Sequence, residues 1–255
     1  MNSNAFTFKS TIALMVACFF AACSGPAPVA EENNTVPVAE ISATPGTTTP
    51  APADSSKQDA VYLIKTTMGD IKVKVYKECP LHQANFDKLV SSKYYDGVLF
   101  HRVIKEFMIQ TGDPDSKAAQ PGAQYGAGGP NYTIPAEILP QFYHKKGALA
   151  AARQGDEVNP YKASSGSQFY IVHGKKLTDQ ELNGIMMQTG VKFSPQAIND
   201  YKTIGGAAFL DGQYTVFGET LSGLDIVDKI ATVKTLSGDR PVTDIKIISI
   251  EKVTE

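Results

Sequence analysis

The sequence predicts a mainly β domain, folded as a closed or nearly closed barrel, over residues 58–255. One observation is a series of short apolar segments that alternate like half-buried strands and are separated by turns rich in glycine, proline and aspartate. The other is a pair of amphipathic helical segments, each suited to pack against a sheet, among these many short strands. A second pair of helical segments, at about 176–206, predicts a helical hairpin inserted between strands.

The first half of this domain begins with a hairpin and a helix. Apolar residues alternate with lysines after the turn Met68-Gly69-Asp70, which is typical of a β-hairpin over 61–75. Pro80 opens a helix that runs to about Ser91. Its expected buried face consists of Leu81, Ala84, Phe86, Leu89 and Val90. Strands are expected over 98–104 and 107–109, and the aperiodic stretch 111–143 that follows is a loop long enough to suggest a functional role.

The second half places the helical hairpin between further strands, which are expected over 147–152, 168–172 and 214–218. Thr178-Asp179-Gln180-Glu181 matches a capping box that starts one helix, and Ser194-Pro195 starts another that ends before Gly205. Ser222 is expected to cap a final helix. The helix buries Leu224, Ile226, Val227 and Ile230, and the last strand alternates Ile245, Ile247 and Val253 with polar residues.

The first 57 residues predict export and anchoring rather than a folded domain. Thr11 to Ala22 is an apolar run too short to span a bilayer and typical of a signal peptide over 1–22. It leads into Cys23 in a sequence that resembles a bacterial lipoprotein cleavage box; Cys18 offers a competing site, and plain secretion is the alternative. The stretch 23–57, rich in Pro, Ala and Thr, predicts a lipid-anchored flexible linker. We expect a cell-envelope protein, anchored in the outer membrane and facing the periplasm.

Composition and motifs exclude several classes of function. The net charge is −2, so no basic field indicates a nucleic-acid partner. The chain lacks a Walker loop and a Gly-x-Ser-x-Gly elbow, and its histidines are too far apart to suggest a zinc-binding pair. Cys79 is the one cysteine beyond the export segment, and we expect it to be a buried apolar residue. No metal or cofactor is therefore expected.

One positive charge lies among large apolar side chains. Strand alternation would place His101 and Arg102 on opposite faces, with the apolar residues Phe107 and Met108 close by. An arginine on a strand is usually a surface or ion-paired residue. These residues by themselves therefore do not indicate catalysis.

Three segments resemble the cyclophilin family of peptidyl-prolyl isomerases. The first, Phe100 to Gln110, reproduces the pattern Phe-His-Arg-Val-Ile-x-x-Phe-Met-x-Gln. The second, 166–171, resembles Gly-Ser-Gln-Phe-Phe-Ile, and the third, 209–218, is similar to Trp-Leu-Asp-Gly-x-x-x-Val-Phe-Gly. They occur in the family's order, and the resemblance covers about 60–255.

The resemblance implies an eight-stranded antiparallel β-barrel capped by two helices, with the active site on its outer face. It implies that Arg102 is catalytic, that Gln110 orients it and that His101 lies beside it. The implied substrate contacts are Phe107, Met108, Ala152, Arg153, Tyr170, Phe209, Leu210 and Tyr214. Such a site suits rotation about an X-Pro amide, whose barrier is roughly 18–20 kcal/mol, because an apolar cup can hold the ring while a permanent positive charge stabilises the twisted imide.

The chain departs from the family pattern at four of these positions, one of which is Arg153, where the family has an asparagine whose backbone it uses. Tyr170 replaces a phenylalanine and adds a hydroxyl that must find a partner, and Tyr214 replaces a histidine common in eukaryotic members. Phe209 replaces a tryptophan associated with cyclosporin binding, so we expect weakened inhibition by cyclosporin. The hairpin at 176–206 is either a packed decoration or a docking surface.

The sequence therefore predicts a peptidyl-prolyl isomerase that assists folding of exported proteins, with unfolded or partly folded proline-containing chains as partners. A catalytically silent proline-binding or chaperone module is the alternative, and a structural envelope lipoprotein is a third. The presence of both Arg102 and Gln110 favours catalysis.

Overall fold

The computed structural model describes residues 58–253 of the chain. The predicted signal peptide, the lipidation site Cys23 and the linker lie outside these residues. Within the described part, no helix combines the length and apolarity needed to cross a membrane.

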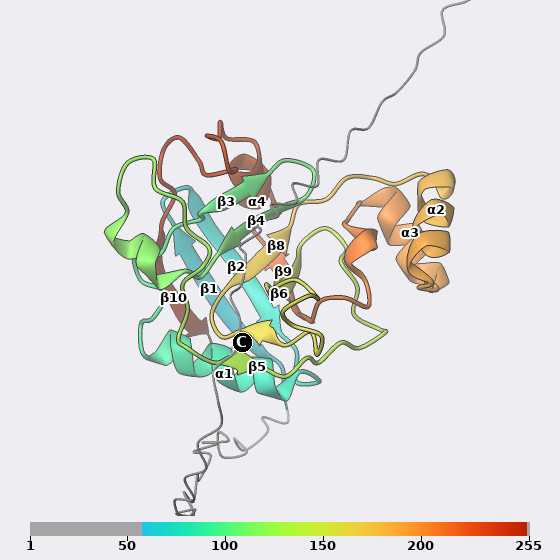
Figure 1. Cartoon of the computed structure of the whole chain (residues 1–255), viewed down its shortest axis with the longest axis horizontal. Helices are drawn as coiled ribbons and strands as arrows, with labels where there is room; N and C mark the ends of the chain where they lie inside the picture. Colours follow the sequence, from blue (N-terminus) through green and yellow to red (C-terminus); the bar gives the residue numbers. More distant parts are fainter. Residues whose placement is uncertain (1–57, 254–255) are drawn as a thin grey trace, which may run out of the picture. The chain divides into compact units, whose positions relative to one another are not determined.

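A curled antiparallel sheet of eight strands forms the domain, as predicted (Figure 1). Its strand order is β10-β1-β2-β9-β6-β8-β4-β3. The strands are β1 (Ala60–Thr66), β2 (Gly69–Val75), β3 (Arg102–Ile104), β4 (Met108–Thr111), β6 (Ala148–Ala151), β8 (Phe169–Val172), β9 (Val216–Ser222) and β10 (Ile247–Val253). A small second sheet pairs β5 (Thr133–Ile134) with β7 (Ser164–Ser165).

The predicted strand over 98–104 is shorter than expected, and the reason is closure of the barrel. Only its end forms β3, whereas the preceding segment pairs with the start of the last strand. The backbone N–H of Phe100 donates to the carbonyl of Ile245 at 2.9 Å, and that of Ile247 donates to the carbonyl of Val98 at 2.8 Å. These bonds join the two edges of the sheet, which would otherwise expose unpaired backbone groups.

Two helices cover opposite ends of the curled sheet (Figure 1). They are α1 (Pro80–Ser91) and α4 (Leu224–Ala231), and their apolar residues join the strands in one core. Ser222 does not cap α4, because the N-cap is Gly223 at φ +88°. A Cβ there would meet the carbonyl of Asp70, so both the left-handed backbone and the close approach require glycine.

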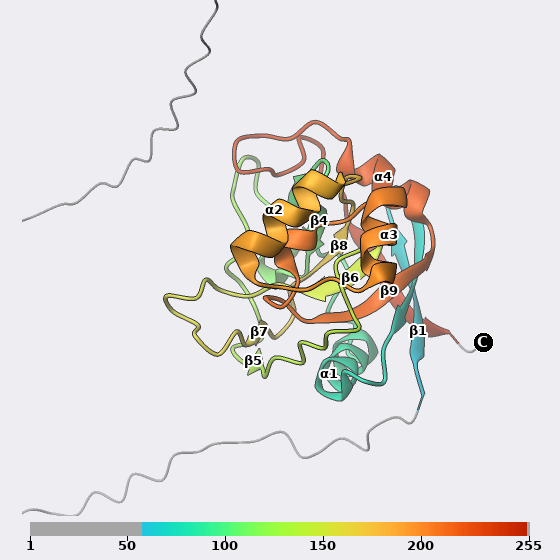
Figure 2. The ribbon, with the colours of Figure 1, turned by 90° about the vertical axis from the view of Figure 1, so that its right-hand side faces the viewer.

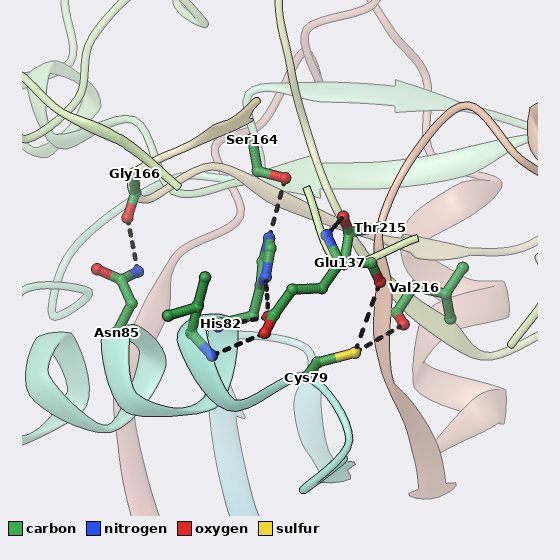
Figure 3. A network of polar contacts seen from close by, with 9 residues as sticks. Cys79, His82, Asn85, Glu137, Ser164, Gly166, Thr215 and Val216 are labelled. Atoms are coloured by element: carbon green, nitrogen blue, oxygen red, sulfur yellow. Dashed lines mark hydrogen bonds and ion pairs between the residues drawn. The ribbon is translucent and has the colours of Figure 1, made fainter. Parts of the chain in front are cut away.

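The start of α1 is held from outside the helix (Figure 3). Its N-cap residue, Cys79, is buried as predicted and makes no side-chain capping bond. The carboxylate of Glu137, from the long loop, instead accepts the N–H groups of Leu81 and His82, each at 3.0 Å. This contact turns His82 inward and leaves Leu81 46% exposed, which corrects the predicted buried face.

The inserted helical hairpin consists of α2 (Asp179–Thr189) and α3 (Pro195–Thr203), which stand to one side of the sheet in Figure 1 and therefore in front of it in Figure 2. The capping box of α2 is confirmed, since Thr178 and Glu181 exchange hydrogen bonds, and Ser194 caps α3. The hairpin contributes to a small separate core, made of Leu177, Leu182, Ala197, Tyr201 and Ala208, the last of which follows the insertion.

Candidate active site

A row of aligned residues crosses four strands on the outer face of the sheet. Arg102 on β3 pairs with Gln110 on β4, Gln110 with Tyr170 on β8, and Tyr170 with Ala150 on β6. Residues that alternate with this row, such as Ile109 and Ile171, point into the main core. Strand alternation thus sorts one set of side chains inward and brings the other set to a common outer surface.

A cavity of about 470 Å³ opens over this row. It brings together all of the predicted catalytic and substrate-binding residues except Phe209. Those that line it are His101, Arg102, Phe107, Met108, Gln110, Ala152, Arg153, Tyr170, Leu210 and Tyr214. Phe209 is half exposed, and its ring centroid lies 5.4 Å from that of Phe107, so it extends the cavity's apolar wall outward.

One wall of the cavity is apolar. Met108, Tyr170 and Leu210 are nearly buried and belong to a second apolar cluster, against which Phe107 and Tyr214 pack. Concave apolar surfaces with a few convergent polar groups are the usual form of a ligand site. An apolar wall of this kind can hold a small nonpolar group of a ligand.

Arg102 provides a positive charge at the same cavity. Its side chain is 43% exposed, and its Nε lies 3.5 Å from Oδ2 of Asp239, which is equally exposed. An exposed pair at this distance is weak, so the guanidinium stays available to a ligand. The amide of Gln110 donates to Oε1 of Gln168 at 3.0 Å, and that of Gln168 donates to the carbonyl of Gly128 at 2.8 Å.

His101 also lines the cavity together with Arg102, as the family resemblance implies, whereas strand alternation by itself placed the two side chains on opposite faces. Alternation does not apply because His101 lies before the first residue of β3 and belongs to no strand. Burial lowers the pKa of its imidazole to about 4, against an opposing effect of Asp113, so the ring is neutral near pH 7. Neither of its ring nitrogens has a hydrogen-bond partner within residues 58–253.

A wall of the cavity that sequence reasoning missed is formed by 124–127, within the long loop. The buried carboxylate of Asp113 accepts the N–H groups of Gly126 and Gly128, and the guanidinium of Arg240 donates to the carbonyls of Gln120 and Ala123 at 2.8 and 2.6 Å. The same guanidinium lies 5.2 Å from the ring centroid of Tyr125. The loop's length was the only signal in the sequence, and it did not indicate which residues would reach the site.

The remaining wall comes from the segment after β6. The side chain of Arg153 is nearly buried: its Nε donates to the carbonyl of Gln213 at 2.8 Å, and its guanidinium lies 4.6 Å from the ring centroid of Tyr214. Ala152 donates to the carbonyl of Gln168 at 3.0 Å. Arg153 is therefore held within the wall, which leaves Arg102 as the more accessible of the two guanidinium groups.

A curled antiparallel sheet that carries an apolar cavity and an arginine on its outer face has the architecture of the cyclophilin class. A family model described as cyclophilin type peptidyl-prolyl cis-trans isomerase matches residues 61–252. The chain therefore belongs to the cyclophilin family and is a peptidyl-prolyl cis-trans isomerase.

Similar proteins from bacteria and animals are named as isomerases of the same kind. A putative peptidyl-prolyl cis-trans isomerase of Staphylococcus epidermidis is 34% identical over 74% of this chain and 89% of its own length. The human peptidyl-prolyl cis-trans isomerase-like 1 is 33% identical over 77% of this chain and 94% of its own length. A putative bifunctional phosphatase/peptidyl-prolyl cis-trans isomerase of Streptococcus pyogenes is 35% identical, but the match spans only 37% of that longer protein.

Solved structures support the same fold. The crystal structure of a Cryptosporidium parvum cyclophilin type isomerase matches with a TM-score of 0.56 at 24% identity, covering 78% of this chain and 99% of that one. A second structure of that protein, determined in the presence of the dipeptide Ala-Pro, matches with a TM-score of 0.55.

Proposed function

We propose that this isomerase assists the folding of exported proteins and that Arg102 lowers the barrier to rotation about the X-Pro amide. The observation that carries the mechanism is that one cavity contains both Arg102 and an apolar wall. Arg102, Gln110 and Tyr170 lie in one row across neighbouring strands along this cavity. The wall holds the proline ring while the preceding residue rotates. No bond is broken, so neither a nucleophile nor a proton donor is required.

The energetic role of Arg102 follows from the electronic change during rotation. The planar amide shares the nitrogen lone pair with the carbonyl, and twisting returns that pair to the nitrogen. A guanidinium that hydrogen-bonds the twisted imide nitrogen stabilises the transition state more than the ground state, and arginine remains charged at any working pH. Because Arg102 is partly exposed in the free protein, a bound chain must displace water from it, which strengthens the interaction once the substrate is in place.

The mechanism is tested by substitution of Arg102. We expect Arg102→Ala to lower kcat/KM on an Ala-Pro peptide by roughly 100-fold or more, in line with the loss of one transition-state hydrogen-bond donor. Lys105→Ala is the matched control, since it removes an exposed positive charge from the same β3–β4 turn. Exchange measured by NMR avoids a coupling protease. Normal turnover in Arg102→Ala would refute the mechanism, and a wild-type protein that binds the peptide without exchange would be the silent binding module instead.

The role in export rests on the first 57 residues. A signal-peptide core that leads into Cys23, followed by a proline-rich spacer, supports a lipid-anchored enzyme that reaches chains emerging in the periplasm. Mass spectrometry of the mature N-terminus tests this directly. A lipid-modified Cys23 is the expected result, whereas an unmodified first residue or a start at Cys18 would contradict it.

Weak binding of cyclosporin is a further part of the proposal. Phe209 cannot offer the indole N–H of the family's tryptophan, and such a bond contributes roughly 0.5–1.5 kcal/mol. Phe209→Trp should therefore tighten inhibition by about 2- to 12-fold in a titration of turnover. Nanomolar inhibition of the unaltered protein would show that the aromatic exchange has no consequence.

A further inference from the structure

The hydroxyl that Tyr170 adds to the cavity wall ends a buried chain of hydrogen bonds that begins in the helical insertion. The hydroxyl of Tyr201, on α3, donates to Oδ2 of Asp211 at 2.5 Å. Oδ1 of Asp211 lies 2.7 Å from Nδ1 of His144 and also accepts the backbone N–H of His144 at 2.9 Å. Nε2 of His144 lies 3.0 Å from the hydroxyl of Tyr170.

The direction of these bonds follows from the chemistry of the groups. A carboxylate only accepts, so Nδ1 of His144 carries a proton and donates to Asp211. In the imidazole tautomer whose proton is on Nδ1, Nε2 is an acceptor, and the hydroxyl of Tyr170 donates to it. Burial raises the pKa of Tyr170 and of Tyr201 well above the usual value, so both phenols remain protonated donors.

The members of the chain are buried and lie in different elements. Tyr201 and His144 have no exposed surface, and Tyr170 and Asp211 are 4% and 6% exposed. Asp211 directly follows Leu210, so the carboxylate that Tyr201 binds is adjacent to a second residue of the cavity wall. In a close-packed interior with few exposed groups, loss of one bond obliges its neighbours to move or to leave a buried polar group unpaired.

We propose that the helical insertion shapes the apolar wall of the active site through this chain, which makes Tyr201 a positioning residue for isomerisation. The inference rests on the proposed function, in which Tyr170 and Leu210 contact the proline ring. Tyr201 touches no substrate. Its effect is to hold Asp211, and through His144 to hold the ring of Tyr170, in the orientation that the proline ring contacts.

The structure also provides a matched control for this role. The hydroxyl of Tyr143 donates to Oδ2 of Asp200, on α3, at 2.6 Å. This bond likewise fastens the insertion to the domain, but it is not part of the chain that reaches Tyr170. Tyr143→Phe therefore removes a tyrosine–aspartate bond to the same helix but keeps the ring that packs against Tyr201, and the lost hydroxyl takes no part in the bonds of Asp211.

The test is a double-mutant cycle on Tyr201→Phe and Tyr170→Phe, with kcat and KM measured on an Ala-Pro peptide by NMR exchange and stability measured by urea unfolding. We expect Tyr201→Phe to raise KM about 3- to 10-fold while kcat changes less than twofold, and Tyr143→Phe to leave KM unchanged. In the Tyr170→Phe background, the effect of Tyr201→Phe on KM should shrink at least threefold, because the ring is no longer tied to His144.

Equal effects of Tyr201→Phe in both backgrounds would overturn the proposal, as would an equal rise of KM in Tyr143→Phe. A different result would contradict the proposed pocket itself: neither Tyr170→Phe nor Leu210→Ala would change KM. The catalytic role of Arg102 is judged separately, because its substitution acts on kcat.

Discussion

His82 and His101 are both 2% exposed, yet their surroundings differ completely. Both ring nitrogens of His82 are bonded, Nδ1 to Oε2 of Glu137 at 2.6 Å and Nε2 to the hydroxyl of Ser164 at 2.9 Å (Figure 3). Those of His101 have no hydrogen-bond partner in the described part of the chain, and the ring borders the cavity that holds Arg102.

The His82 region contains the residue types and contacts of a Ser-His-acid triad without its accessibility. Ser164 is 1% exposed, and the adjacent cavity of about 20 Å³ has room for little more than a water molecule. Glu137 is already occupied by two backbone N–H groups of α1. A polar cluster whose members satisfy one another stabilises the fold, whereas a buried polar group without a partner lowers stability and is a more frequent feature of a functional site.

The largest effect should come from Glu137→Ala. The change leaves the imidazole of His82 and two N–H groups at the start of α1 without their acceptor, and we expect it to lower the free energy of unfolding by about 3–5 kcal/mol. Urea unfolding measures this, with the exposed Glu157→Ala as control. Turnover per folded molecule should not change, and a selective loss of turnover would place the His82 region in the active site.

A slightly smaller effect concerns the pH dependence of stability. The pKa of His101 falls from 6.5 to about 4 on folding, so the unfolded chain binds more protons than the folded one between these values. Protonation of His101 therefore lowers the free energy of unfolding as the pH falls from 6.5 to 4, by on the order of 3 kcal/mol in total. Above pH 6.5 this loss is absent. His101→Gln should remove that part of the acid loss in unfolding curves, and an unchanged acid profile in the variant would show that His101 is not held neutral by the fold.

Ser164→Ala should have a more modest effect. It removes the partner of Nε2 of His82, and we expect a loss of about 1–2 kcal/mol in the free energy of unfolding with unchanged isomerase turnover. If the wild-type protein hydrolysed an activated ester and Ser164→Ala did not, Ser164 would be a nucleophile. The conclusion that the His82 region only stabilises the fold would then be wrong.

The smallest expected effect is that of pH on turnover. Because arginine does not titrate and His101 is already neutral, kcat/KM should vary by less than about twofold between pH 6 and 8. Exchange of an Ala-Pro peptide followed by NMR across this range measures it. A bell-shaped profile would show that another group changes protonation during catalysis.

Local patterns were sufficient where short-range interactions decide the structure. The alternation after Gly69 specified the hairpin, Pro80 marked the first turn of α1, and Thr178 with Glu181 marked the start of α2. These elements depend on backbone geometry and on neighbours within a few residues. The three family-like segments added the identity of the cavity residues, whereas Arg102 by itself looked like an ordinary surface residue.

Contacts between distant parts of the chain decided the rest. Glu137 selected which side of α1 is buried, closure of the barrel shortened the strand before Arg102, and Arg240 set the position of a loop that lies more than a hundred residues earlier. The sequence by itself determined the helices, the turns and the alternation of the strands, because those arise from local sterics and hydrophobic periodicity. Only the tertiary structure determined which polar groups are mutually satisfied and which remain beside the cavity, because pairing depends on strand register and loop closure between residues that no short-range pattern connects.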